Sequence, residues 1–243
     1  MISSVFLKNK KTFFLDFLPM VIAATLIVTF AIIREQSFFK TLPTLITLVV
    51  QILLVYINPF AFLLGSVNSA IYGVVFLTEG LYFSSIQAFL ISFPIQAYSF
   101  INWSKGKNKK DKKNVSLRRL SAGQLLAVLA AVGALWAAAY FGLAPFFSGA
   151  TYPYIDALNF SISIAASILA AVFYVESQYF TFSGSLISLC TWILITIQAP
   201  QNLNYVILSL YNVFRLSQTS VTWTKRYINE RRAESEAVTK ANE

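Results

Sequence analysis

The sequence contains no histidine, a single cysteine and few charged residues, and each shortage excludes a class of function. Cys190 has no partner for a disulfide within the chain, and a Cys/His zinc site cannot form. Histidine-based acid–base or nucleophilic catalysis is excluded for the same reason, and no cofactor is expected. Charged residues make up 12% of the chain, against about a quarter in soluble domains.

Hydrophobic residues make up 57% of the 243 residues, and they are concentrated in long blocks. A helical block of about 20 apolar residues is long enough to cross the hydrocarbon core of a bilayer. The first block is too long for a signal peptide, and no convincing cleavage site follows it. We therefore predict an all-α polytopic membrane protein. Its eight spans are expected at about 13–33, 41–57, 60–77, 81–103, 122–146, 154–174, 178–197 and 203–224.

The basic residues predict the orientation of the chain. Of the 19 Lys and Arg residues, three precede the first span, eight lie in the loop 104–121 and five follow the last span. With eight spans these segments fall on one side, so the positive-inside rule places both termini inside the cytoplasmic membrane. The net charge of +9 is thereby explained without nucleic-acid binding. A basic loop that binds a protein partner stays open as an alternative.

A short repeated pattern divides the spans into groups. Trp103 and Trp223 each close a span and are followed within two residues by a lysine. Three spans lead up to each tryptophan, which predicts a 1+3+1+3 layout with two parallel three-helix repeats. The segments are 1–40 (basic segment and extra helix), 41–103 (first repeat), 104–121 (basic cytoplasmic loop), 122–152 (linking helix), 153–225 (second repeat) and 226–243 (charged cytoplasmic tail).

Polar side chains recur at helical spacing inside the spans of both predicted repeats. Polar groups are costly in a bilayer, so they normally face a bundle interior or a cavity. Single Ser or Thr residues that bond their own helix carbonyls are the alternative explanation. The stripes predict a shared cavity for a polar, uncharged or weakly charged ligand. The candidate binding residues are Asn68, Tyr72, Ser92, Gln96, Trp103, Asp156, Asn159, Ser163, Gln178, Thr181, Ser185, Asn212 and Arg215.

Two of these candidates are charged. Asp156 begins the sixth span, where a carboxylate suits a helix N-terminus or a ligand site equally well. Arg215 lies about 15 Å from Lys225 by helix rise, which is too deep for simple snorkelling. Arg215 either pairs with another group inside the bundle or lines the path of the ligand through the bundle. The second interpretation is preferred. Pro94 and Gly65 are predicted bending points in their helices.

Three segments carry a family resemblance: GSVNSAIYG, FPIQAYSFINW and YPYIDALNFSISIAASILAAVFYVES. They are similar to the PnuC family of membrane transporters, and the resemblance covers about residues 40–225. Within these segments Asn68, Gln96, Trp103 and Asp156 match the family's pattern.

The resemblance implies a fold related to the SWEET transporters. It also implies facilitated diffusion of a nucleoside or vitamin, typically nicotinamide riboside, without ATP or ion coupling. A homotrimer and a functional link to a cytoplasmic kinase that phosphorylates the imported substrate follow from the same resemblance.

The second predicted repeat departs from the family pattern. Nicotinamide riboside transporters usually carry a Trp-x-x-Trp where this sequence has Gln178 and Thr181, and Ser167 and Ser185 replace other polar residues. Losing two indoles should change which ring is bound, so deoxyribonucleosides, thiamine and riboflavin remain alternatives. A non-transporting assembly or receptor subunit is an alternative of another class. A membrane-embedded enzyme is a third, which the lack of histidine and of an acidic cluster opposes.

Overall fold

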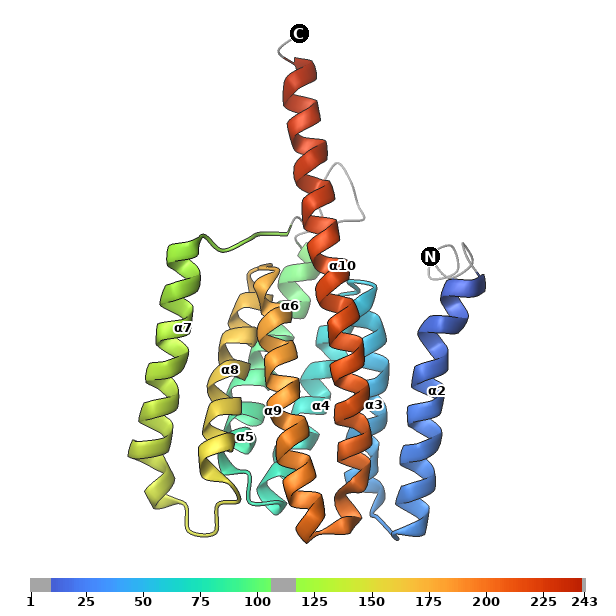
Figure 1. Ribbon diagram of the computed structural model, residues 1–243, viewed down its shortest axis with the longest axis vertical. Helices are drawn as coiled ribbons and strands as arrows, with labels where there is room; N and C mark the ends of the chain where they lie inside the picture. Colours follow the sequence, from blue (N-terminus) through green and yellow to red (C-terminus); the bar gives the residue numbers. More distant parts are fainter. Residues whose placement is uncertain (1–9, 106–116, 242–243) are drawn as a thin grey trace.

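The computed structural model describes residues 10–105 and 117–241, and nearly all of them are helical (Figure 1). Within this part of the chain the β structure is a single isolated bridge between Arg118 and Tyr174. The helices are α2 (Lys10–Ile33), α3 (Phe38–Val55), α4 (Phe60–Thr78), α5 (Tyr82–Ile86), η1 (Gln87–Ser92), α6 (Phe93–Lys105), α7 (Ala122–Ala137), η2 (Ala138–Leu143), η3 (Ala144–Phe146), α8 (Pro153–Ala171), α9 (Glu176–Gln198), η4 (Pro200–Asn202) and α10 (Leu203–Ala241). The all-α prediction is confirmed.

Each predicted span corresponds to helical structure. Five segments are long and apolar enough to cross a membrane: α3, α4, α8, α9 and the continuous stretch Ala122–Phe146. The apolar part of α2, Phe17–Ile33, is shorter. The predicted fourth span is divided among α5, η1 and α6, and the predicted eighth lies within the longer α10. The grouping into two repeats stays a prediction.

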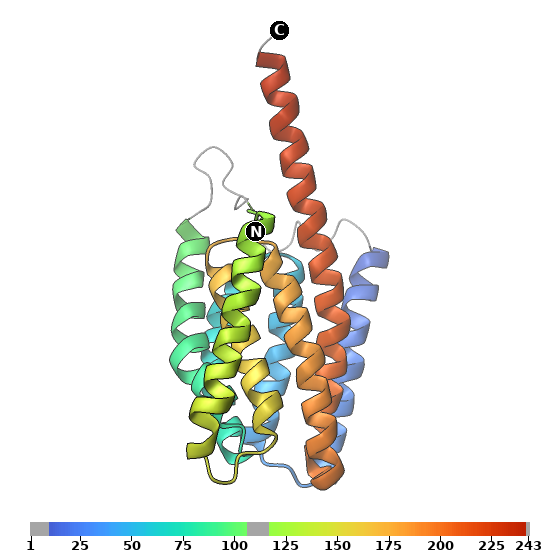
Figure 2. The ribbon, with the colours of Figure 1, turned by 60° about the vertical axis from the view of Figure 1, so that its left-hand side comes forward.

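The helices form one bundle with two peripheral members (Figures 1 and 2). Helix α7 lies at one edge beside α8, and α2 lies at the other beside α3 and α10. Helix α2 is held there by a cluster that contains Ala23, Ile27, Leu48, Leu208 and Tyr211. The remaining helices surround the interior of the bundle.

Helix α2 begins, α6 ends and α7 begins at the same end of the bundle (Figure 1). Helix α10 extends well beyond the bundle at this end, which we call the tail end. The opposite end, formed by the α2–α3, α4–α5 and α9–α10 connections, is called the turn end. Lys10 at the start of α2 and Lys105 at the end of α6 lie at the tail end, as the predicted orientation requires, and the orientation itself stays a prediction.

Two helical stretches contain a π turn just before a proline. Segment η1 precedes Pro94, and η2 precedes Pro145. Proline has no N–H, and its ring crowds the carbonyl four residues earlier, so the turn before it widens. At the end of η1 the N–H of Phe93 donates to the carbonyl of Ala88, five residues back. The regular helix is thus interrupted before Pro94, whereas α4 continues through Gly65 without a break.

At the tail end, two tryptophans each donate a hydrogen bond to a backbone carbonyl of another helix. Trp103 Nε1 on α6 donates to the carbonyl of Ala170 on α8 at 3.0 Å, and Trp223 Nε1 on α10 donates to Leu54 of α3 at 3.2 Å. Their ring centroids are 5.2 Å apart. Together with Phe62 and two aliphatic residues they form a buried cluster, called the Trp103–Trp223 cluster below.

A second aromatic cluster lies toward the turn end. The rings of Trp192 on α9 and Tyr205 on α10 stack with centroids 4.1 Å apart. Phe76 of α4 lies 6.4 Å from Trp192, centroid to centroid. Val75 and Ile195 pack into the same buried group, which we call the Trp192–Tyr205 cluster.

Candidate functional site

A cavity of about 320 Å³ lies inside the bundle and is lined by residues of α3, α4, α5, η1, α6, α8, α9 and α10. This volume is at the lower end of the range of about 300–1,000 Å³ for small-molecule sites. Every described residue that lines it is uncharged. The polar lining consists of Gln51, Ser84, Gln87, Ser92, Gln96, Ser99, Asn159, Ser163, Ser167, Gln178, Thr181, Ser185, Ser188 and Asn212.

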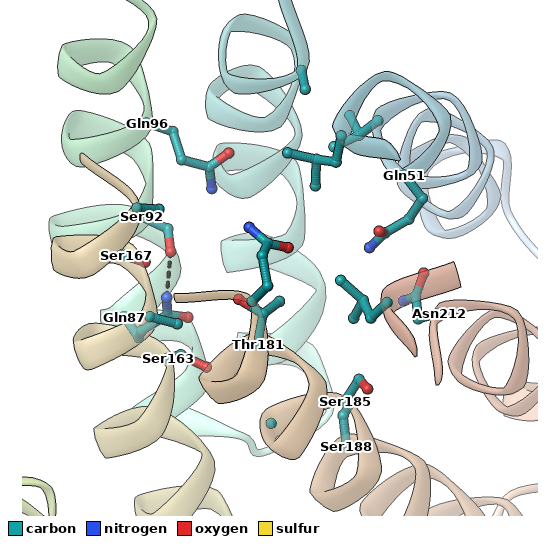
Figure 3. A pocket seen from close by; sticks show the side chains of 18 of the residues that line it. Gln51, Gln87, Ser92, Gln96, Ser163, Ser167, Thr181, Ser185, Ser188 and Asn212 are labelled. Atoms are coloured by element: carbon teal, nitrogen blue, oxygen red, sulfur yellow. Dashed lines mark hydrogen bonds between the residues drawn. The ribbon is translucent and has the colours of Figure 1, made fainter. Parts of the chain in front are cut away.

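The π turn shapes one wall of the cavity. Gln87 Nε2, at its start, donates to Ser92 Oγ at its end, and both side chains line the cavity (Figure 3). These residues are five apart, so a regular α-helix would rotate them onto different faces. The wider π turn brings them together. Pro94 therefore determines which side chains this wall presents.

Gln96 lies against helix α4 because residue 65 is a glycine. A Cβ atom at Gly65 would stand 2.0 Å from Gln96 Oε1, which is far inside van der Waals contact. In this position Gln96 Nε2 donates to Ser69 Oγ at 2.9 Å. Gly65 thus serves close packing of a cavity side chain.

Three amide oxygens at the cavity have no partner among the described residues: Gln51 Oε1, Gln178 Oε1 and Asn212 Oδ1. The Gln51 and Gln178 side chains are buried, with 7% and 3% of their surface exposed. An unsatisfied buried acceptor costs about 1–3 kcal/mol, so a ligand that donates hydrogen bonds here would be stabilised. Gln51 and Asn212 lie across the cavity from Gln96 and Ser92 (Figure 3).

The structure brings together eight of the predicted candidates in this lining: Ser92, Gln96, Asn159, Ser163, Gln178, Thr181, Ser185 and Asn212. It adds Gln51, Ser84, Gln87, Ser99, Ser167 and Ser188. Gln51, Ser99, Ser167 and Ser188 lie on the polar stripes that predict the cavity, although they are not among the candidate binding residues. Gln87 could not be found in this way, because the π turn breaks the helical period.

Asn68 and Tyr72 lie outside the lining. Asn68 Nδ2 donates to Thr47 Oγ1 at 2.8 Å, and Thr47 Oγ1 lies 3.4 Å from the Tyr72 hydroxyl. The Tyr72 ring stacks on Phe76 with centroids 5.3 Å apart, and Phe76 does line the cavity. Both side chains therefore form a polar layer between α3 and α4, one residue removed from the cavity.

Asp156 also lies outside the lining, where it caps another helix. Its carboxylate is 2% exposed and accepts from the backbone N–H of Phe83 at 2.9 Å and of Ser84 at 3.1 Å. The Ser84 hydroxyl donates to it as well. These N–H groups belong to the first turn of α5, whose donors have no partner within the helix. Asp156 meets the cavity only through Ser84.

The last two candidates, Trp103 and Arg215, are fully buried elsewhere in the bundle. Trp103 is 1% exposed and belongs to the Trp103–Trp223 cluster. Arg215 is 0% exposed, and its NH1 group donates to Gln218 Oε1 within α10 at 2.7 Å. The cavity face of α10 is formed instead by Asn212 and Leu216.

Aromatic clusters adjoin the cavity toward both ends of the bundle. Leu54, Phe62 and Ala170 line it and also belong to or pack against the Trp103–Trp223 cluster. Phe76 lines it and packs against the Trp192–Tyr205 cluster. The polar space is therefore bounded by apolar side chains toward the tail end and toward the turn end.

Comparisons with known proteins identify the family and the fold of this chain. Residues 37–225 match the family model described as nicotinamide mononucleotide transporter. The structure is similar to one described as the crystal structure of the vitamin B3 transporter PnuC, with a TM-score of 0.75 and 16% identity. The match covers 88% of this chain and 92% of that chain, and at this identity it shows a shared fold. No match was found among the curated proteins. The chain belongs to the nicotinamide mononucleotide transporter family, the PnuC family of multi-pass membrane proteins.

Proposed function

We propose that this protein transports a nucleoside or nucleoside-like vitamin by facilitated diffusion through the central cavity. The observation that carries this proposal is a cavity whose described lining is uncharged and in which the buried amide oxygens of Gln51, Gln178 and Asn212 have no partner among the described residues. Sugar hydroxyls and ring N–H groups are donors that suit these acceptors. The ligand is bound rather than chemically changed, so the protein is not an enzyme in this proposal.

The charge of the cavity favours a nucleoside over a nucleotide. The family description names a mononucleotide, and a phosphate monoester carries about −1.5 to −2 charge at pH 7. All described lining residues are uncharged, so such a phosphate would lose its hydration without gaining a counter-charge. Burying an unpaired charge in this way is costly.

Transport would proceed by alternating access, with the two predicted helix triplets rocking about the cavity. The Trp103–Trp223 cluster and the Trp192–Tyr205 cluster would separate in turn. With both termini in the cytoplasm, a cytoplasmic kinase would make uptake net inward, because its phosphorylated product would be rejected by an uncharged cavity. A homotrimer is part of the proposal by family resemblance.

Matched pairs of ligands test this proposal most sharply. We expect calorimetry on the purified protein to detect binding of at least one of nicotinamide riboside, thymidine, deoxyadenosine, thiamine and riboflavin. The phosphate monoester of the bound compound should bind at least ~100-fold more weakly, because its charge has no partner in the cavity. A monophosphate that binds as tightly as its parent nucleoside would contradict the neutral-site assignment.

Flux measurements separate a transporter from a receptor subunit. Liposomes that contain only this protein should take up the bound compound faster than empty liposomes. Gln96→Ala should weaken binding, whereas Gln198→Ala removes an exposed amide outside the cavity and should not. Binding without flux would favour the receptor alternative, and equal binding by the Gln96→Ala variant would refute the site.

A methyl group at residue 65 should disturb the cavity without unfolding the bundle. In Gly65→Ala the new Cβ would displace Gln96 and break its bond to Ser69. We expect ligand affinity to fall about 3- to 10-fold, as for one neutral hydrogen bond. Titration calorimetry measures this change. Gly133→Ala is the control, since apart from its own helical turns no heavy atom of the described residues lies within 4 Å of a Cβ built there, and the affinity of this variant should equal that of the parent.

A further inference from the structure

We propose that a groove at the tail end, separate from the cavity, binds the phosphate group of a ligand at the membrane surface. The groove has a volume of about 280 Å³ and lies between residues 117–119, the α8–α9 turn and the part of α10 after Lys225. It shares no lining residue with the central cavity. Phosphate binding in the groove can therefore be tested independently of the transported substrate.

The backbone on one side of the groove is fixed by hydrogen bonds. The N–H of Arg118 donates to the carbonyl of Phe173 at 2.9 Å, and the N–H of Val175 donates to the carbonyl of Arg118 at 3.0 Å. The preceding Leu117 is 5% exposed and packs into the Trp103–Trp223 cluster. The arginines at 118 and 119 are thus attached to an ordered segment next to the bundle.

The charges that line the groove leave a positive surplus. Arg118, Arg119 and Arg231 oppose one acid, Glu230, so the lining carries three positive charges and one negative charge. Glu230 is already engaged, since it accepts from Leu117 N at 3.1 Å and from Arg226 Nε at 2.7 Å. Glu176, which stands 3.6 Å from Arg119, and Arg226, which contacts Glu230, add one charge of each sign. An anion in the groove would therefore still meet more positive than negative charge.

The arginines are also oriented. Arg231 Nε donates to the Tyr227 hydroxyl at 3.2 Å, and its guanidinium lies over the Tyr227 ring at 5.7 Å from the centroid. Arg119 Nε stands 3.6 Å from Glu176 Oε1, at the start of α9. Guanidinium groups bind phosphate oxygens in a bidentate manner, and prior orientation reduces the entropic cost of binding.

The position of the groove favours a ligand at the bilayer surface. Tyr174 lines it and lies between the last residue of α8, Ala171, and the first residue of α9, Glu176. On the other side of the groove, the chain runs from residues 117–119 across the tail end to the apolar helix α7 (Figure 1). Basic pockets at this level of a membrane protein suit anionic lipid head groups. Membrane orientation alone requires basic residues on one side, but not an ordered groove that holds three arginines.

The phosphate has two chemical sources, a lipid head group or a soluble phosphate compound, and one assay distinguishes them. Thermal unfolding would be measured in nanodiscs of phosphatidylcholine with or without phosphatidylglycerol. In detergent it would be measured with sodium pyrophosphate or with sodium chloride at equal ionic strength. We expect phosphatidylglycerol or pyrophosphate, whichever supplies the phosphate, to raise the unfolding midpoint of the parent protein by about 2–4 °C. The Arg118→Gln/Arg231→Gln double variant should lose this shift.

The control variant is Arg34→Gln/Arg232→Gln, which removes the same charge at exposed residues outside the groove and should keep the shift. A shift with phosphatidylglycerol alone identifies the head group, and one with pyrophosphate alone identifies a soluble phosphate compound. The proposal is overturned if neither source gives a shift that depends on Arg118 and Arg231, or if the control loses it equally. Arg118→Gln alone, at an exposed side chain, keeps the test available should the double variant not fold.

Discussion

Truncation of Trp103 or Trp223 to alanine should lower the free energy of unfolding by about 3–5 kcal/mol, the usual cost of removing a large buried aromatic. Trp103 is 1% and Trp223 0% exposed, and their rings contact one another. Each indole also donates to a backbone carbonyl of a neighbouring helix, Trp103 to α8 and Trp223 to α3. Each truncation therefore removes packing and a link between helices at the tail end.

The same truncation should open the cavity toward the tail end. Leu54, Phe62 and Ala170 separate the cavity from the two indoles and would lose part of their packing. Cys190 is the only cysteine, so Cys190→Ser followed by Ser99→Cys places one thiol in the cavity lining. Labelling by a membrane-impermeant thiol reagent should be faster when Trp103→Ala is added.

Two further variants serve as controls for this result. Trp103→Phe retains a ring in the cluster but loses the indole donor, so it should lower the free energy of unfolding by only about 1 kcal/mol. Trp136→Ala removes a tryptophan of α7 that does not line the cavity, so it should leave labelling unchanged. Equal labelling rates in the Trp103→Ala variant and its parent would mean that the cluster does not close this end.

Removal of the Asp156 carboxylate is the second large expected effect. Asp156→Ala should lower the unfolding free energy by about 2–4 kcal/mol, because the buried N–H groups of Phe83 and Ser84 lose their acceptor. The carboxylate also lies at the first turn of α5, where a negative charge is favoured by the helix dipole. Since α8 and α5 would lose this polar link and keep the packing of Phe83 on Phe160, the wall that carries Ser84 should loosen.

Thermal unfolding in detergent measures this change, and graded variants identify its cause. Asp156→Asn keeps one acceptor oxygen but no charge. It should therefore lower the free energy of unfolding by less than Asp156→Ala does. Ser84→Ala removes only the hydroxyl donor and should cost less than Asp156→Ala. Glu35→Ala deletes an exposed carboxylate and should have no effect. An Asp156→Ala protein as stable as its parent would contradict the capping role.

Much of the fold and part of the site follow from local features of the sequence. Transfer of apolar side chains into a bilayer is favourable residue by residue, so block length alone predicts helices such as 60–77 and 154–174. Helical periodicity likewise identifies Gln178, Thr181 and Ser185, because the three lie on one face of α9. These properties depend only on residues near one another in the chain.

Contacts between distant helices decided the rest. Asp156 could have capped a helix or bound a ligand, and only the arrival of α5 beside α8 assigns it to the Phe83 and Ser84 N–H groups. Gly65 packs against Gln96, which no pattern in α4 predicts. Gln87 enters the cavity through a π turn. Each outcome depends on which partner satisfies a buried polar group or fills a close contact. The sequence by itself therefore determined the spans and their polar faces, while the tertiary structure decided which of those polar groups line the cavity.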